Sequence, residues 1–200
     1  MTYVWSTGGV GSGESFAGVV GGGLVGLNKG TIERSWSGAA VGGEDNYGGL
    51  VYENDGCITQ SYATGDVRVI GTHESGTGLV YTNYGTISQS YSTGRVDTLI
   101  GDGAFVGQNG GVIEESFFAG KAGQTASLDS YGAIASYNQG TIRNNVYWDQ
   151  ISSNHMNYVG DSFNGIAPPP SNGLTTAQMS DQAKFVSWNF GPSGAWAMAP

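Results

Sequence analysis

Residues 23–36 read Gly-Leu-Val-Gly-Leu-Asn-Lys-Gly-Thr-Ile-Glu-Arg-Ser-Trp, and the same order of residue types returns four more times along the chain. The shared pattern is Gly-Leu-Val-x-x-Asn-x-Gly-x-Ile-x-x-Ser-aromatic, which the fifth copy follows least closely. Its asparagine lies at positions 28, 54, 83, 109 and 138, so successive copies are 26, 29, 26 and 29 residues apart. A pattern that recurs in register at such intervals indicates a repeat array.

The length and composition of the copies select one repeat architecture. No copy holds a stretch free of glycine and β-branched residues that is long enough for a pair of helices, which excludes tetratricopeptide and ankyrin arrays. The leucine-rich pattern Leu-x-x-Leu-x-Leu-x-x-Asn is absent, and propeller blades need longer units. We therefore predict an all-β parallel β-helix, or β-solenoid, of about five coils of 26–29 residues, stacked ~4.8 Å apart.

Equivalent apolar positions predict the interior of the solenoid. Because the copies stack in register, each position forms a column of like side chains along the rod. Burial of one such side chain contributes roughly 1.5–3 kcal/mol. The three predicted columns are Leu24, Leu50, Leu79, Phe105 and Ile134; Ile32, Ile58, Ile87, Ile113 and Ile142; and Val41, Val67, Val96, Ala122 and Ile151.

Polar positions predict the corners of each coil. Asn28-Lys29-Gly30 and its four equivalents predict one corner, because asparagine and glycine tolerate left-handed backbone. Ala63-Thr64-Gly65 and Ser92-Thr93-Gly94 predict a second corner by the same reasoning. The extra residues of the longer copies enter one loop, so alternate coils should project longer loops around residues 73–75 and 126–128. Insertions on one face of a solenoid often mark its binding side.

The pattern also predicts how the chain is divided. Residues 1–151 form the solenoid, and residues 152–200 form a linker and a C-terminal cap. Residues 5–10 match the closing half of a coil. The array therefore begins within a repeat, and we expect that Met1 is not the natural start of the protein.

The C-terminal cap is predicted from local signals. Residues 167–173 contain three consecutive prolines and read as a linker. Thr175 and Gln178 have the spacing of a capping box and predict the start of a short helix. An apolar face beyond it would cover the open end of the solenoid, where strand edges lack partners. The side chains expected on that face are Met179, Phe185, Val186 and Trp188.

The repeat resembles a known family motif. Residues 23–32 and 62–67 are similar to the GLUG-motif repeat of large bacterial surface proteins of the filamentous-haemagglutinin type. Residues 145–149 and 173–179 resemble the segment that commonly follows those repeats. The resemblance implies secretion, often through an outer-membrane partner, display at the bacterial outer surface, and a role in adhesion or biofilm. The partner that it implies is a host or matrix glycan or protein.

Composition excludes several other classes. The net charge is −9, with only seven Lys and Arg, which argues against binding to nucleic acids or anionic membranes. Cys57 is the single cysteine, so neither an intrachain disulfide nor a cysteine-based zinc site is expected. His73 and His155 lack ligand spacing. Residues 21–26 match a dinucleotide fingerprint, but a corner at Asn28 follows where a helix is required. We expect neither a metal nor a cofactor.

An enzyme is the alternative to a binding protein. Parallel β-helices often carry polysaccharide lyases, hydrolases or epimerases, whose sites gather carboxylates with a Lys or Arg in one groove. Asp66, Arg95 and Lys121 form the one mixed-charge stripe that we find across adjacent coils. Cross-coil ion pairing on a solvated corner accounts for such a stripe more simply. We therefore expect no catalytic residues and keep the enzyme as the alternative.

Two sets of aromatic residues are the candidate binding residues. Trp36, Tyr62, Tyr91 and Phe117 occupy equivalent positions and form one column, and Tyr52 and Tyr81 form a second pair. Stacked rings offer a platform for sugars, but packing on one another or in a core is the simpler account of such a column. Together with the family resemblance, which implies a bacterial adhesin, the predicted fold favours a non-catalytic β-solenoid segment that acts as a spacer and contact surface. A fibre subunit that self-associates through open strand edges is a further alternative.

Overall fold

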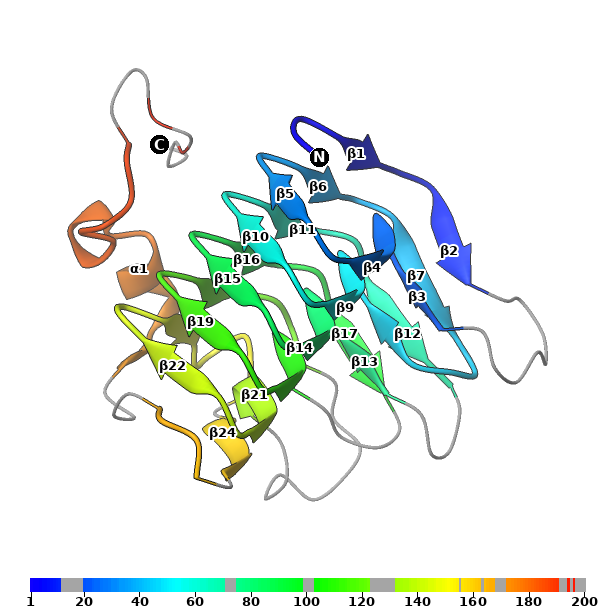
Figure 1. Cartoon of the computed structure of the whole chain (residues 1–200). Coiled ribbons are helices and arrows are strands. Elements are labelled where there is room, and N and C mark those ends of the chain that lie inside the picture. Colours follow the sequence, from blue (N-terminus) through cyan, green and yellow to red (C-terminus); the bar gives the residue numbers. More distant parts are fainter. Residues whose placement is uncertain are drawn as a thin grey trace.

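The computed structural model describes residues 1–11, 20–70, 75–98, 103–122, 132–154, 156–162, 164–167, 172–190, 194 and 196. Over these residues the chain winds through about five turns, and each turn lies on the preceding one (Figure 1). All strand pairs among them are parallel, and the strands align in five sheets that run along the stack, three of them over nearly its whole length. The predicted all-β solenoid is confirmed.

Three large sheets form most of each turn, with their strands in stacking order. The seven-stranded sheet contains β1 (Trp5–Ser6), β6 (Trp36–Ser37), β11 (Tyr62–Ala63), β16 (Tyr91–Ser92), β20 (Phe117–Phe118), β23 (Tyr147–Asp149) and β25 (Gly173–Leu174). The six-stranded sheet contains β4 (Val25–Asn28), β9 (Val51–Asn54), β14 (Val80–Asn83), β18 (Val106–Asn109), β21 (Gly132–Asn138) and β24 (Asn157–Ser162). The five-stranded sheet contains β5 (Thr31–Glu33), β10 (Cys57–Thr59), β15 (Thr86–Ser88), β19 (Val112–Glu114) and β22 (Thr141–Arg143).

Two smaller sheets complete the turns in the N-terminal part of the stack. The four-stranded sheet contains β2 (Gly9–Gly11), β7 (Ala40–Gly43), β12 (Val67–Val69) and β17 (Val96–Thr98). The three-stranded sheet contains β3 (Gly21–Gly22), β8 (Tyr47–Gly48) and β13 (Gly76–Thr77). The α-helix α1 (Thr176–Met179) and a 3-10 helix (Gln182–Lys184) follow the last strand. Among the described residues, no helix is both long and apolar enough to cross a membrane.

The interior columns form largely as predicted. The five isoleucines pair in register from Ile32 to Ile142, and each is at most 1 % exposed. Leu50 and its equivalents Leu79, Phe105 and Ile134 are fully buried, while Leu24 in the first copy is partly buried. Like side chains therefore meet along the rod, and the core is continuous from coil to coil.

The third column differs from the prediction at both ends. Val41, Val67 and Val96 pair in register, Val10 precedes them, and Ala122 bridges to Val96. The assignment of Ile151 to this column is wrong. Ile151 lies in a turn after β23, where its N–H donates to the Asp149 carboxylate at 2.9 Å, and it is 55 % exposed.

Strand pairing also shows where the repeat array begins and how the chain continues after it. Trp5 pairs with Trp36 and Val10 with Val41, which confirms residues 5–10 as the closing half of a coil. Beyond residue 151, where the sequence suggested a linker and cap, strand pairing continues. β24 adds to β21, Ile166 bridges to Thr141, and β25 adds to β23. The chain thus adds further strands to the stack before the helices begin.

The asparagine corner forms for a different reason from the one predicted. None of the five repeat asparagines has a positive φ. They are at most 6 % exposed, and each Nδ2 donates to the Oδ1 of the next asparagine at 2.7–2.8 Å. The last one, Asn138, donates to the Ile166 carbonyl at 3.3 Å. The asparagines form a buried ladder, which we call the asparagine ladder, and their side chains satisfy one another in the interior.

The left-handed backbone lies six residues later instead. The residue before the repeat serine has a φ between +44° and +54° in every copy. These residues are Arg34, Gln60, Gln89, Glu115 and Asn144. In the first four copies the buried serine that follows stabilises the bend. Each serine hydroxyl donates to the carbonyl two residues before it, and Ser35, Ser61 and Ser90 each donate a backbone N–H to the hydroxyl of the next serine at 3.2 Å.

The corner glycines are required by the close approach of neighbouring coils. Among the described glycines only Gly8, Gly11 and Gly43 have a positive φ, so Gly65 and Gly94 at the second predicted corner do not. A Cβ at Gly94 would overlap the Gly65 carbonyl oxygen. Of the two longer loops predicted, only Ser75 belongs to the described residues, and it is buried and bonded to Asn46.

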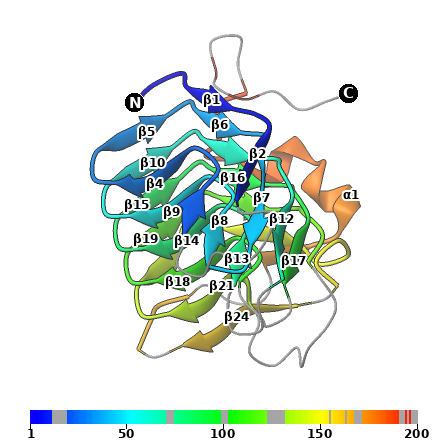
Figure 2. The ribbon, with the colours of Figure 1, turned by 90° about the vertical axis from the view of Figure 1, so that its right-hand side faces the viewer.

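The C-terminal segment packs against a side of the rod. The predicted capping box is confirmed, since Thr175 accepts from the Gln178 N–H and Gln178 accepts from the Thr175 N–H. α1 contacts β23 and β25, and Figure 2 shows it at the side of the stack. Phe185 and Trp188 are buried against rings of the seven-stranded sheet, whereas Val186 is 76 % exposed and Met179 partly buried. The prediction that this apolar face covers the open end is therefore wrong.

Candidate binding surface

The predicted aromatic column lies on the seven-stranded sheet. The rings of Trp36, Tyr62, Tyr91 and Phe117 stack nearly parallel, with centroid distances of 5.9, 4.8 and 4.8 Å and interplanar angles of 4° or less. All four side chains are half-buried. Face-to-face stacking means that each inner ring turns its edge to solvent, so the column itself gives a sugar few ring faces to lie on.

The C-terminal segment covers most of this column. Phe185 meets Phe117 edge-on at 5.4 Å, and Trp188 lies 5.4 Å from the same ring. Trp196 lies 5.2 Å from Tyr91 and 6.1 Å from Tyr62, tilted by 58° and 59°. From residue 185 to 196 the contacts thus move from the fourth copy back to the second, toward the end of the stack where the N-terminus lies (Figures 1 and 2). We call the described residues of this segment, 185–190, 194 and 196, the aromatic strap.

A row of polar side chains flanks the column, and we call it the outer ladder. Arg34 Nε donates to Gln60 Oε1 at 2.9 Å, Gln60 Nε2 donates to Gln89 Oε1 at 3.0 Å, and Gln89 Nε2 donates to Glu115 Oε2 at 3.1 Å. Gln89 Nε2 also reaches the carbonyl of Ser187, which ties the strap to the ladder. All four residues have left-handed backbone, so the bend projects them to the surface beside the rings.

Column, ladder and strap enclose a groove of about 380 Å³, which is within the range of ligand pockets. Its lining residues are Tyr3, Arg34, Trp36, Gln60, Tyr62, Gly194 and Trp196. Arg34 Nη1 donates to the Tyr3 hydroxyl at 2.6 Å, and the Arg34 guanidinium lies 5.7 Å from the centroid of the Tyr3 ring. The groove therefore combines aromatic walls with fixed, planar hydrogen-bonding groups.

The surroundings of Arg34 and of the nearby tyrosines determine their ionisation states. The hydrogen bond with Tyr3 raises the pKa of the Arg34 guanidinium, which stays positively charged. Burial raises the pKa of Tyr62, and burial followed by the charge of Tyr62 raises the pKa of Tyr91 to about 12. Both tyrosines are therefore neutral hydroxyls at ordinary pH.

The second aromatic pair lies on a different sheet. Tyr52 and Tyr81 stack at 5.4 Å and 6° on strands β9 and β14 of the six-stranded sheet. Burial, followed by the charge of Glu53, raises the pKa of Tyr52. Both rings are half-buried, and a glycine, Gly107, occupies the next position of the column. This pair does not join the groove at Trp36.

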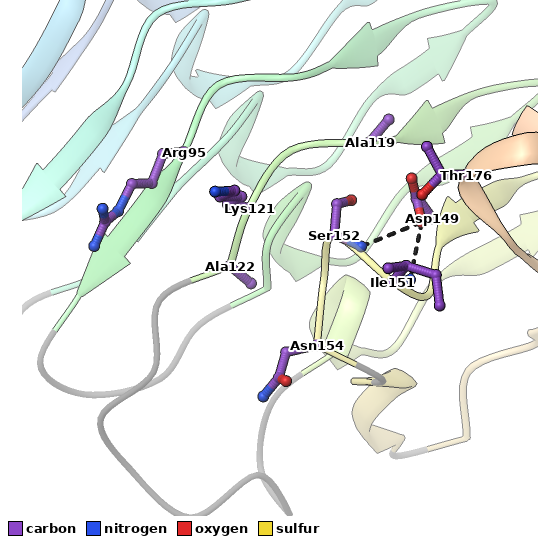
Figure 3. A pocket seen from close by; sticks show the side chains of 9 residues that line it. All are labelled: Arg95, Ala119, Lys121, Ala122, Asp149, Ile151, Ser152, Asn154 and Thr176. Carbon is purple, nitrogen blue, oxygen red and sulfur yellow. Dashed lines mark hydrogen bonds between the residues drawn. The ribbon is translucent and has the colours of Figure 1, made fainter. Parts of the chain in front are cut away.

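The charged stripe lies beside a second groove, of about 620 Å³ (Figure 3). Asp66 accepts from the backbone N–H of Arg95 at 2.9 Å, while the Arg95 guanidinium pairs with Asp97 at 2.9 Å. Arg95 and Lys121 line this groove, and Asp66 does not. The side chains of the stripe are thus exposed, and Arg95 forms its ion pair with Asp97, two residues later in the chain.

The carboxylate of the second groove serves the local turn. Asp149 is buried, and its Oδ1 accepts the N–H groups of Ile151 and Ser152 at 2.9 and 3.2 Å (Figure 3). The Ser153 hydroxyl donates to the Asp149 carbonyl at 2.6 Å. An aspartate that caps a turn in this way is held by the backbone. The Asp149 carboxylate therefore has a structural role, although it lines the same groove as Arg95 and Lys121.

The remaining candidate residues, the two histidines and the cysteine, lie only partly within the described residues. His73 and His155 lie outside the described residues. Cys57 is exposed and free. Among the residues that the structure describes, no three His, Cys, Asp or Glu side chains gather closely enough to hold a metal ion.

Five residues of the first groove were not predicted from the sequence: Tyr3, Arg34, Gln60, Gly194 and Trp196. A signal was present for two of them. The position before the repeat serine holds Arg, Gln, Gln, Glu and Asn in the five copies, and it is always a polar side chain. Treated as a column like the isoleucines, it would have predicted a polar row beside the aromatic one. No comparable signal connects residues 3 and 196 to this face.

Comparison with known proteins gave no match: no family model fits the chain, and no significantly similar curated protein or solved structure was found.

Proposed function

We propose that this chain is a non-catalytic β-solenoid segment of a secreted or surface-displayed bacterial adhesin, serving as a rigid spacer and as a contact surface. The assignment to an adhesin rests on the resemblance of the repeat to the GLUG motif. The observation that carries the contact role is the groove in which Arg34 and Gln60 lie beside Trp36, Tyr62 and Trp196. Aromatic walls with a few fixed polar groups are typical of binding sites.

The spacer role is supported by how the rod is stabilised. The asparagine ladder and the buried isoleucine column join successive coils through identical contacts. In a stack of this kind each coil needs only its neighbours, so the same unit extends a rod to any length. Function can then reside in the outward-facing residues, which do not have to fill the core.

The enzyme alternative has weaker support. A polysaccharide lyase or hydrolase needs a carboxylate free to exchange protons with its substrate. In the second groove the Asp149 carboxylate already accepts two backbone N–H groups, and Arg95 is paired with Asp97. These two residues of that groove are therefore engaged in the fold.

Adhesion of coated particles tests the proposal. Beads carrying the 200-residue chain are applied to surfaces coated with bacterial matrix polysaccharide or with host glycoproteins, and beads carrying the heat-denatured chain serve as the control. We expect several-fold greater retention of the folded chain on at least one surface, with no new reducing sugar ends in the supernatant. Equal retention of both bead types would contradict the contact role, and release of reducing ends would favour the enzyme.

A further inference from the structure

We propose that the groove between Arg34, Gln60 and Trp196 binds one pyranose ring of a neutral glycan. This inference names the ligand class of the proposed contact surface, and it therefore rests on the proposed function. Three features of the groove support it: the orientation of its rings, the hydrogen-bonding groups that remain available, and the charge of the chain around it.

The rings of the groove form a corner. Trp36 and Tyr62 are parallel to within 4°, whereas Trp196 is tilted by 59° against Tyr62 with 6.1 Å between centroids. A tilted ring cannot stack fully on its neighbour, so apolar surface remains exposed in the angle between the two. The C–H face of a pyranose is apolar and flat enough to pack there, while its hydroxyls point to the rim.

The polar groups at the rim are held in place before any ligand arrives. Arg34 uses Nε for Gln60 and Nη1 for Tyr3. Of the five N–H donors of a guanidinium, those on Nη2 are not used by these two bonds. The Tyr3 oxygen accepts from Arg34, so its own O–H is available as a donor. Because Gln60 is fixed in turn by Gln89, little side-chain entropy is lost when a sugar hydroxyl binds.

The charge of the surroundings selects a neutral sugar. The chain carries a net charge of −9, and Glu33 lies 3.8 Å from the Arg34 guanidinium. A single cation beside a carboxylate does not offset the repulsion between an acidic protein and a polyanionic polysaccharide. Hydroxyl groups accept hydrogen bonds from Arg34 without that cost.

Titration of oligosaccharides tests the inference. The complete chain is titrated with a tetrasaccharide of galactose and, separately, with the matching tetrasaccharide of galacturonic acid, and binding is followed by tryptophan fluorescence and calorimetry. We expect the neutral sugar to bind and the acidic one to bind about tenfold more weakly or not at all. Tighter binding of the acidic sugar would overturn the assignment of ligand class.

Variants locate the binding in the groove. Arg34→Gln and Trp196→Ala are expected to weaken binding of the neutral sugar by about tenfold each, whereas Arg68→Gln, an exposed arginine on the four-stranded sheet, should have no effect. Trp196 lies in the strap, outside the repeat coils, so its replacement leaves the interior columns intact. Equal affinities of Arg34→Gln, Trp196→Ala and Arg68→Gln would overturn the site.

The two proposals fail separately. If the coated beads adhere and no sugar binds in the groove, the contact role remains and the ligand class is wrong. If the tetrasaccharide binds in the groove but the beads are retained no better than the denatured control, the groove is a sugar site and the adhesive function is wrong.

Discussion

Two rows of side chains run along the solenoid with nearly the same hydrogen bonds and very different sequences. The asparagine ladder joins five copies through bonds of 2.7–2.8 Å. The outer ladder joins four copies through bonds of 2.9–3.1 Å. The first contains asparagine in every copy, whereas the second contains Arg, Gln, Gln and Glu.

The difference between the two rows follows from burial. In the asparagine ladder a lost partner leaves an amide without a hydrogen bond in the interior, where water cannot replace it. In the outer ladder solvent takes the place of a missing partner at little cost. The buried position must therefore hold asparagine in every copy, whereas the residue type at the exposed position can vary. The outer ladder is the row in which residues such as Arg34 can serve a ligand.

Replacement of one inner asparagine should have the largest effect. Asn83→Ala removes the acceptor of Asn54 and the donor to Asn109, both in the interior. Because two buried amides each lose a ladder partner that water cannot replace, we expect the free energy of unfolding to fall by about 3–5 kcal/mol. Urea denaturation followed by circular dichroism measures it. A loss below about 1 kcal/mol would show that buried water or rearrangement satisfies the neighbours and that burial does not explain the identity of the row.

Replacement of a corner glycine should come next. A Cβ at Gly85 would overlap the carbonyl oxygen of Gly56 in the preceding coil, whereas a Cβ at Gly26 would meet nothing within 4 Å. We expect Gly85→Ala to lower the free energy of unfolding by about 2–3 kcal/mol, because the coils must separate locally. Gly26→Ala, the matched control, should be neutral or slightly stabilising. Equal denaturation midpoints for the two variants would contradict close coil stacking as the reason for the glycine.

The side chains of the aromatic column are less buried than the asparagine ladder and more buried than the outer ladder. A change in the column should therefore alter the stability by an intermediate amount. Tyr91 has its pKa raised to about 12 by burial, against about 10 in the unfolded chain. Its contribution to stability is complete below about pH 10 and is lost as pH rises toward about 12, because the unfolded chain ionises first.

A comparison with Tyr91→Phe isolates this effect from the other tyrosines. Between about pH 9 and 12 we expect the wild-type chain to lose about 2 kcal/mol more than the variant, a figure reduced for the partial exposure of the ring. Thermal denaturation at a series of pH values gives the two slopes. Parallel slopes would indicate that solvent reaches the Tyr91 hydroxyl freely and that the strap does not cover the column.

The repeat pattern predicted the fold because the interior columns are made of the residues that define the pattern. The isoleucines meet in register, and the serine and glycine positions are buried or closely stacked in most copies. Left-handed backbone was the wrong reason for the asparagines, because a local rule about turns was applied to residues whose contacts lie in the next coil. Left-handed backbone at Gln60 and Gln89 could not be predicted by residue type, since glutamine has no preference for it.

The remaining errors arise where the pattern ends. β24 and β25 add to the stack with residues unlike those of the repeats, so the sequence gives no signal of their pairing. Ile151 was placed by counting, but the Asp149 turn directs the chain outward before the column is reached. Phe185 and Trp188 were expected at the open end, and only tertiary packing shows that the rings of the strap fit the exposed edges of Phe117 and Tyr91.

The smallest effect is expected in the outer ladder, in the same copy as Asn83. Gln89→Ala removes three side-chain hydrogen bonds, to Gln60, Glu115 and the Ser187 carbonyl, against four at Asn83. Because Gln89 is half-exposed and water replaces these partners, we expect a loss of about 0.5 kcal/mol in the same urea assay.

A second substitution at this position separates the side chain from the backbone. Gln89 has a φ of +44°, a conformation that costs a residue with a Cβ about 1 kcal/mol and glycine very little. Gln89→Gly should therefore be at least as stable as Gln89→Ala, although it removes the same hydrogen bonds. If instead both variants lost as much as Asn83→Ala, the outer ladder would be as necessary to the rod as the inner one. The surface would then not be free to vary, and the reason for seeking function there would fail.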